Sequence, residues 1–154
     1  MLLDTDVMVD ILRGYPPAIN WLESLGNAEI GLPGLVGMEL IEGERDRQGI
    51  MKLLRFLGKY SLYWPQQDDC QQAFAVFSRA RFSHHLGLLD SLIGLTARGL
   101  NRPLCTFNQK HYRTILGLAL RKIILWICKR KGYDYKPISL PLKNSPLAFW
   151  EKAV

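Results

Sequence analysis

The chain begins Met1-Leu2-Leu3-Asp4-Thr5-Asp6-Val7. Leu2 and Leu3 predict a short buried strand, and residues 7–13 predict a helix that Thr5 or Asp6 could cap. A strand that runs directly into a carboxylate points it at the carboxyl edge of the sheet, where open α/β folds bind ligands. Because one buried carboxylate is costly, a functional site here requires further polar residues at the same edge.

Short apolar runs alternate with longer helical patterns along the rest of the chain. The predicted strands cover residues 2–3, 29–32, 62–64, 103–106 and 118–120, and the predicted helices cover residues 7–13, 16–25, 38–45, 50–60, 66–81, 90–100 and 110–116. Strands separated by helices predict an α/β fold with a central, mostly parallel sheet of four to five strands flanked by helices.

The composition is that of an ordinary globular protein, with 48% hydrophobic and 22% charged residues among 154. The longest apolar run near the end, residues 123–128, is too short to span a membrane. No basic residue precedes Arg13, which argues against a secretory signal. The three cysteines show no paired spacing, so we expect reduced thiols and a cytoplasmic protein.

The positive charge is concentrated at the end of the chain. Residues 1–112 hold 11 basic and 12 acidic residues, whereas residues 113–154 hold 9 basic and 2 acidic ones. We therefore expect a near-neutral domain over residues 1–120 and a basic C-terminal extension over residues 121–154, with a further helix over residues 122–130. Such an extension suits a polyanion, but a solvated tail without function fits the composition equally well.

Four polar residues are expected at the carboxyl edge of the sheet. Asp4 ends the first strand, Glu39 lies in the first turn of the helix predicted from residue 38, Asp90 begins the next-to-last helix, and Asn108 follows the fourth strand. Oxygen ligands of this kind suit Mg²⁺ or Mn²⁺, which neutralise several acids that share one site. A bound cation of this type supports phosphoryl chemistry because it activates water and offsets charge on the leaving oxygen.

The segments around these residues, 2–7, 37–43, 89–93 and 106–112, resemble the four signature blocks of PIN-domain ribonucleases, especially the VapC-type toxins of toxin-antitoxin pairs. Each block alone is weak, but their order and their spacings of 35, 51 and 18 residues make the set fairly specific. The resemblance covers about residues 1–120 and implies a PIN-like three-layer fold.

The resemblance also implies a function. It implies a metal-dependent endoribonuclease with Asp4, Glu39, Asp90 and Asn108 as catalytic residues, the three acids holding Mg²⁺ or Mn²⁺. It implies RNA as the substrate, a cognate antitoxin as a partner, and a homodimer.

Some positions leave alternatives open. Asp6 stands where the family commonly has Asn, and it could support the site or, more simply, cap the first helix. Asn108 stands where many relatives have Asp, which suggests a weaker cation site. Thr106 and Ser91 could hold a metal ligand, or could be a strand end and a helix cap. Each acid alone could also be a helix cap or surface acid, and His111 is expected to pack rather than to act in the site.

Two other functions compete with the ribonuclease. One is a catalytically weakened PIN-like module that binds RNA or protein, which Asn108 and the unusual tail keep open. The other is a phosphatase of the haloacid-dehalogenase type, in which Asp4 would be the nucleophile. That family expects Thr or Val where this chain has Met8, which argues against it.

Overall fold

The structure, a computed structural model, describes residues 1–83 and 86–121. The helix predicted over residues 122–130 lies outside the described residues, as does nearly all of the predicted extension, 121–154. The division of the chain at residue 120 therefore stays a prediction.

Five short strands form one sheet in which every pair is parallel. In sheet order the strands are β3 (Ser61–Tyr63), β2 (Gly31–Pro33), β1 (Leu2–Leu3), β4 (Leu104–Cys105) and β5 (Leu120–Arg121). The first strand of the chain thus lies in the centre of the sheet, with Leu2 paired to both Gly31 and Leu104. Leu2 and Leu3 are fully buried, as expected for a strand that is covered on both faces. The predicted α/β fold with a parallel sheet is confirmed.

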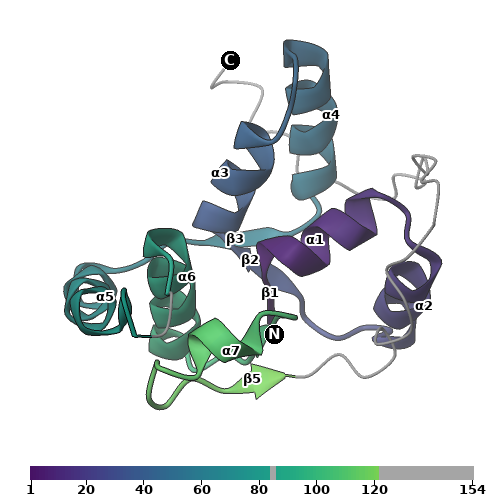
Figure 1. The fold of residues 1–154 in the computed structure, drawn as a ribbon. Coiled ribbons are helices and arrows are strands. Elements are labelled where there is room, and N and C mark those ends of the chain that lie inside the picture. The colour runs from purple at the N-terminus through teal and green to yellow at the C-terminus, as the bar shows by residue number, and fades with distance from the viewer. Residues whose placement is uncertain (84–85, 122–154) are drawn as a thin grey trace.

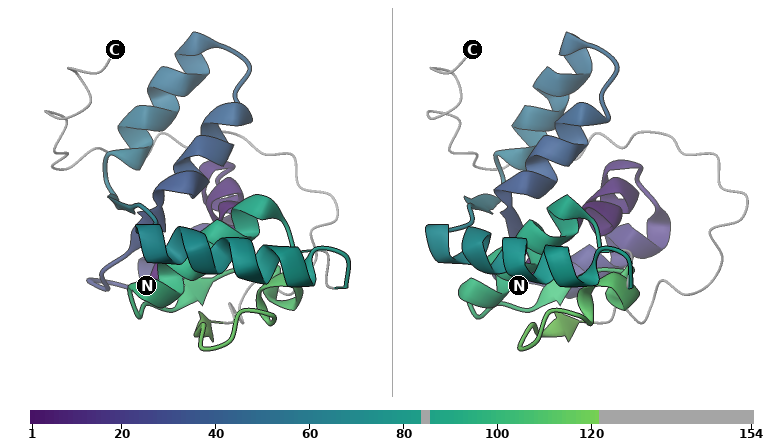
Figure 2. Two further views of the ribbon diagram at one scale, coloured as in Figure 1. Left: turned by 90° about the vertical axis from the view of Figure 1, so that its left-hand side faces the viewer. Right: turned by 60° about the vertical axis from the view of Figure 1, so that its left-hand side comes forward.

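Seven helices surround the sheet in the described part of the chain: α1 (Thr5–Leu12), α2 (Pro16–Ser24), α3 (Gly34–Glu42), α4 (Arg47–Leu57), α5 (Gln67–Ala80), α6 (Leu88–Gly99) and α7 (Gln109–Tyr112). Figure 1 shows α5 and α6 together on one side of the sheet and α1 and α2 on the other. Helices α3 and α4 pack on each other and project from the body, as the two views of Figure 2 also show.

The largest difference from the sequence prediction is the start of α3, which begins at Gly34 and not at residue 38. Pro33 occupies the N-cap position, where its fixed φ and its missing N–H cost nothing. Gly34 is required beneath Trp64, because a Cβ there would lie 2.6 Å from the indole ring. The Pro-Gly pair therefore begins the helix directly after β2 and does not form the loop that the sequence suggests. At the other end of the described chain, the helix predicted over residues 110–116 stops at Tyr112.

A glycine in α6 brings the short helix α7 close to the sheet. A methyl group at Gly94 would overlap the end of the Ile115 side chain and lie 3.0 Å from Cδ1 of Tyr112. Tyr112 and Ile115 are both buried. The missing side chain at Gly94 thus allows Tyr112 to pack against α6 near the carboxyl edge of the sheet.

A membrane-crossing helix would have to be longer and more apolar than any helix found over residues 1–83 and 86–121.

We expect Gly94→Ala to destabilise the fold by about 1–2 kcal/mol, because the cost of displacing Ile115 and Tyr112 exceeds the helix preference of alanine. The measurement is the free energy of unfolding in urea. The matched control is Gly37→Ala in α3, where the new methyl group meets only Leu57 at an ordinary 3.7 Å. The control should be neutral or slightly stabilising. Equal effects of the two substitutions would contradict the packing role of Gly94.

Candidate active site

Asp4 lies directly after the central strand β1 and is only 5% exposed. It is also the N-cap of α1, since its Oδ1 accepts a hydrogen bond of 2.9 Å from the N–H of Thr5. The sequence predicted Thr5 or Asp6 as the cap, and the structure places the cap one or two residues earlier. The same carboxylate therefore starts the first helix and faces the carboxyl edge of the sheet.

Burial raises the pKa of Asp4 to about 6 from the ordinary 3.8. The hydroxyl of Thr106, the N–H of Thr5 and the hydroxyl of Tyr112 partly oppose the increase, because they stabilise the charged form. The negative charge of Asp90 adds to the increase in pKa. Asp4 and Asp90 are thus close enough to repel each other, as the prediction of a shared site requires.

Tyr112 marks the point at which three acids converge. Its side chain is fully buried. Burial raises the pKa of its hydroxyl well above the ordinary value, and the charges of Asp4, Asp90 and Asp6 raise it further. The structure therefore brings Asp4, Asp6 and Asp90 together around one tyrosine hydroxyl.

Asp6 does not cap the first helix, and the preferred interpretation of this residue is wrong. Asp4 already holds the cap position, and Asp6 lies in the first turn, one residue after Thr5. Its Oδ2 accepts a hydrogen bond of 3.0 Å from the N–H of Phe107 and lies 3.4 Å from Oγ1 of Thr106. Asp6 thus joins α1 to the segment that follows β4.

Glu39 lies in the second half of α3 and not in its first turn, because that helix begins at Gly34. Its Oε2 accepts a hydrogen bond from the hydroxyl of Thr5. Since Thr5 follows Asp4, this contact links Glu39 to the edge that carries the other acids. In the structure the Glu39 carboxylate is therefore engaged by a threonine.

Asp90 is the third residue of α6, and its Oδ2 accepts a hydrogen bond of 3.1 Å from the N–H of Gly87, the helix N-cap. The same oxygen lies 3.4 Å from Nδ1 of His111. Asn108, the N-cap residue of α7, has its side-chain nitrogen 2.7 Å from the same Nδ1. The shorter contact fits an imidazole that accepts from the Asn108 amide and carries its proton on Nε2. His111 therefore hydrogen-bonds Asn108, and its ring lies beside Asp90 without a proton on Nδ1 to donate to that carboxylate.

The two predicted supporting hydroxyls behave differently. Thr106, directly after β4, is buried; its Oγ1 accepts a hydrogen bond of 2.9 Å from the N–H of Asn108 and faces Asp4 and Asp6. Ser91 is also buried, but its hydroxyl donates to the carbonyl of Leu88 within α6, at 2.6 Å. Thr106 therefore lies against the acids, whereas the Ser91 hydroxyl forms its hydrogen bond within α6.

Three residues of the site were not among the sequence candidates: Thr5, His111 and Tyr112. His111 and Tyr112 stand three and four residues after Asn108, the spacing that places side chains on one face of a helix. If residues 108–112 are taken as one helical turn, this spacing indicates both. Nothing in the sequence distinguishes Thr5 from an ordinary helix-cap residue.

The acids fit a divalent cation held by two carboxylates. Asp4 is buried and repelled by Asp90, so a cation between them would relieve the cost of their charges. Mg²⁺ commonly uses only one or two carboxylates and keeps several waters. Within residues 1–83 and 86–121, no three His, Cys, Asp or Glu side chains already stand in a metal-binding group. A third carboxylate ligand, Glu39, would have to leave Thr5.

Comparison with known proteins identifies relatives over most of the chain. No protein-family model matches it. It is 33% identical to ribonuclease VapC19 of Mycobacterium tuberculosis over 116 residues, which covers 72% of this chain and 90% of that protein. It is 30% identical to ribonuclease VapC10 of the same organism over 114 residues, which covers 73% and 85%.

Solved structures share the fold. A toxin-antitoxin complex from Klebsiella pneumoniae matches with a TM-score of 0.62 and 23% identity, over 77% of this chain and 94% of that one. VapBC-1 from nontypeable Haemophilus influenzae matches with a TM-score of 0.63 and 21% identity, over 79% and 96%.

The two ribonucleases match more than two thirds of the chain. The sequence resemblance is confirmed, and the phosphatase alternative is set aside. The chain belongs to the VapC family of PIN-domain ribonucleases, the toxin type of toxin-antitoxin pairs.

Proposed function

We propose that the protein is a divalent-cation-dependent endoribonuclease that hydrolyses phosphodiester bonds in RNA. The relatives that support this activity are named as ribonucleases. The observation that carries the proposal is the buried carboxylate of Asp4 beside Asp90 at the end of the central strand. Two close acids at this position favour a bound cation over a purely structural role.

We assign Asp4 and Asp90 as the ligands of Mg²⁺ or Mn²⁺, with Glu39 as a third ligand once it leaves Thr5. When bound, the cation would activate a water and offset charge on the phosphate. The protein holds Asp4 in place through Thr106, the Thr5 N–H and Tyr112. His111 orients the Asn108 amide, which supplies a neutral oxygen or positions a water at the rim of the site.

We further propose that the protein acts as a toxin with an antitoxin partner in the cytoplasm and forms a homodimer. Support for the partner comes from the solved structures of similar fold, which include a toxin-antitoxin complex and VapBC-1. The homodimer rests on the family resemblance.

A second candidate is a weakened module that binds RNA or protein without cleaving RNA. One observation favours it: Asn108 stands where an acid is common in the family. An activity measurement separates the two candidates.

We expect Asp4→Asn and Asp90→Asn each to reduce Mn²⁺-dependent cleavage of structured RNA by about 100-fold or more, because each removes a charged cation ligand. Asn retains the helix-capping ability of Asp4, so the fold should persist. Asp68→Asn, in the first turn of α5, is the matched control and should cleave normally. Calorimetry with Mn²⁺ alone should show weaker binding for the two site variants.

Unchanged cleavage by Asp4→Asn would contradict the assignment of the site. Absence of cleavage by the wild-type protein with either cation, together with retained RNA binding, would favour the weakened module.

The raised pKa of Asp4 predicts a definite pH dependence of stability. Because the folded state favours the protonated form, Asp4 contributes most to stability below about pH 4, and that contribution is lost as the pH rises through about 6. In EDTA, Asp4→Asn should therefore be more stable than the wild type at pH 8, by up to about 3 kcal/mol. The difference should disappear near pH 4. Urea unfolding at the two pH values measures it, and a pH-independent difference would refute the assigned pKa.

We expect Tyr112→Phe to move the acidic limb of the pH–activity profile to higher pH. The tyrosine hydroxyl lowers the pKa of Asp4, so its removal leaves a carboxylate that protonates more readily. The phenyl ring keeps its packing against Gly94, so the melting temperature should change little. An acidic limb at the wild-type pH would show that the hydroxyl does not act on Asp4.

A further inference from the structure

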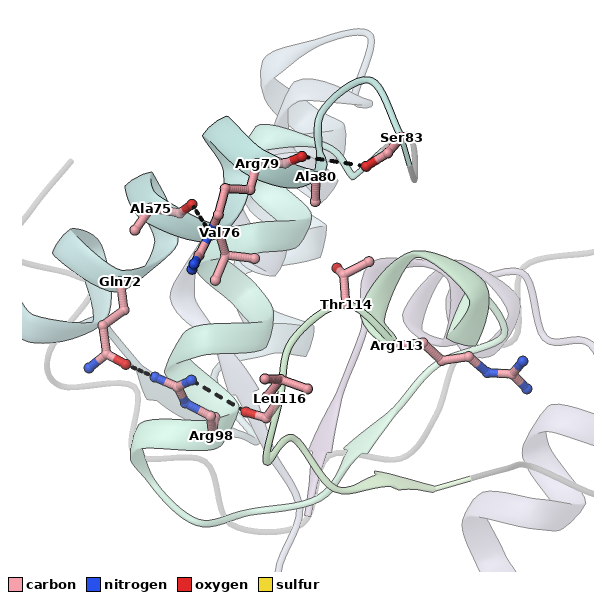
Figure 3. Close-up of a pocket in the computed structure, with 10 residues that line it drawn as sticks. All are labelled: Gln72, Ala75, Val76, Arg79, Ala80, Ser83, Arg98, Arg113, Thr114 and Leu116. Atoms are coloured by element: carbon pink, nitrogen blue, oxygen red, sulfur yellow. Dashed lines mark hydrogen bonds between the residues drawn. The ribbon is translucent and has the colours of Figure 1, made fainter.

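A pocket of about 480 Å³ opens between α5, the end of α6 and the segment after α7. Figure 3 shows Arg79 and Gln72 on α5, Arg98 on α6 and Leu116 on the segment after α7 around it. The size is that of a small-ligand pocket. None of the residues assigned to the acidic site lines it.

The pocket carries positive charge. Its lining residues within the described part of the chain include three arginines, Arg79, Arg98 and Arg113, and no acid. Within residues 1–83 and 86–121, the arginine found in an ion pair is Arg102, with Glu29, so none of the three pocket arginines pairs with a carboxylate there. Figure 3 shows the Arg113 guanidinium turned away from the other two. Arg79 and Arg98 therefore carry the charge of the pocket.

The hydrogen bonds of these two arginines go to neutral groups. Nε of Arg79 donates to the carbonyl of Ala75 at 3.0 Å, which leaves its terminal nitrogens available. Arg98 donates to the side-chain oxygen of Gln72 and to the carbonyl of Leu116, the latter at 3.4 Å. Fixed guanidinium groups of this kind suit an anionic oxygen group such as a phosphate.

Apolar side chains form part of the remaining wall of the pocket, together with the hydroxyl residues Ser83 and Thr114. Val76 and Ala80 of α5 form one side, and Leu116, which is 83% exposed, forms the other. A pocket that combines guanidinium groups with an apolar shelf matches a nucleotide, whose phosphate is charged and whose base and sugar present large flat or apolar surfaces.

The pocket is connected to the acidic site through two helices. Helix α6 carries Asp90 in its first turn and Arg98 in its last turn, about 12 Å apart along the helix axis. Helix α7 carries His111 and Tyr112 and leads directly into Arg113 and Thr114 of the pocket wall. A linear polyanion that is bound at the acidic site can therefore reach the pocket with only a few of its repeating units. This continuity favours an RNA strand over an acidic protein segment.

We propose that this pocket binds one nucleotide of the RNA substrate at a distance from the cleaved bond, with its phosphate on Arg79 and Arg98 and its base or sugar against Val76 and Leu116. The proposal rests on the ribonuclease function proposed above. Helices α5 and α6 would then bind a part of the RNA that the acidic residues do not contact.

The test uses Arg79→Gln and Arg98→Gln, each combined with Asp90→Asn to prevent cleavage, and single-stranded RNA labelled with a fluorophore. We expect each arginine substitution to weaken binding by about three- to tenfold and to reduce the slope of log affinity against log salt by about 0.7. Arg81→Gln is the matched control, because it removes the same charge two residues from Arg79 and does not line the pocket. Its effect should be clearly smaller.

A series of shortened RNAs gives a second readout. Wild-type affinity should fall in one step when the nucleotide that reaches the pocket is removed, and both variants should lack that step. Arg79 is exposed, and within the described residues its side chain donates to Ala75 of its own helix, so Arg79→Gln should remain folded even if Arg98→Gln does not.

The possible results test the proposed nucleotide pocket and the proposed ribonuclease function separately. Wild-type protein that neither binds nor cleaves RNA would overturn the ribonuclease function itself. Normal cleavage by the wild type, with Arg79→Gln and Arg98→Gln indistinguishable from Arg81→Gln, would overturn only the pocket. Loss of binding to the partner protein with unchanged RNA binding would show that the pocket holds an acidic protein segment.

Discussion

The structure depends on a carboxylate that is buried at the end of its central strand. Asp4 leaves water because β1 lies between β2 and β4, and the loss of hydration must be offset by donors supplied from elsewhere. The N–H of Thr5 at the start of α1 is one such donor, and the nearby hydroxyls of Thr106 and Tyr112 also favour the charged form of Asp4. These elements thus pack around Asp4 for two reasons: they stabilise its buried charge, and they bury apolar surface.

The sequence was sufficient to predict the elements that follow simple periodic rules. The strand at Leu2-Leu3, the parallel sheet and the polar residues at its carboxyl edge all follow from patterns within a few residues of one another. Glu39 was assigned to the wrong helical turn because Pro33-Gly34 looks like a loop. Its role as a helix start depends on Trp64, thirty residues later in the chain.

The environment of each acid could not be predicted, because it depends on contacts between distant segments. Asp6 was interpreted as a cap, yet its partner Phe107 is 101 residues away. His111 was expected to pack, yet it bonds Asn108 and lies beside Asp90 of another helix. In the same way, the basic residues of the chain are concentrated after residue 112, but Arg79 and Arg98 of the pocket lie in the near-neutral part.

The central position of the first strand has a consequence for the order of assembly. Leu2 and Leu3 are made long before their partners in β4, residues 104 and 105, and the groups that act on Asp4 extend to Tyr112. Contacts of such large sequence separation form late, because long loops must close before they are made. During synthesis the acidic site therefore stays incomplete until nearly all of the described chain exists. A nuclease built this way is inactive as a nascent fragment.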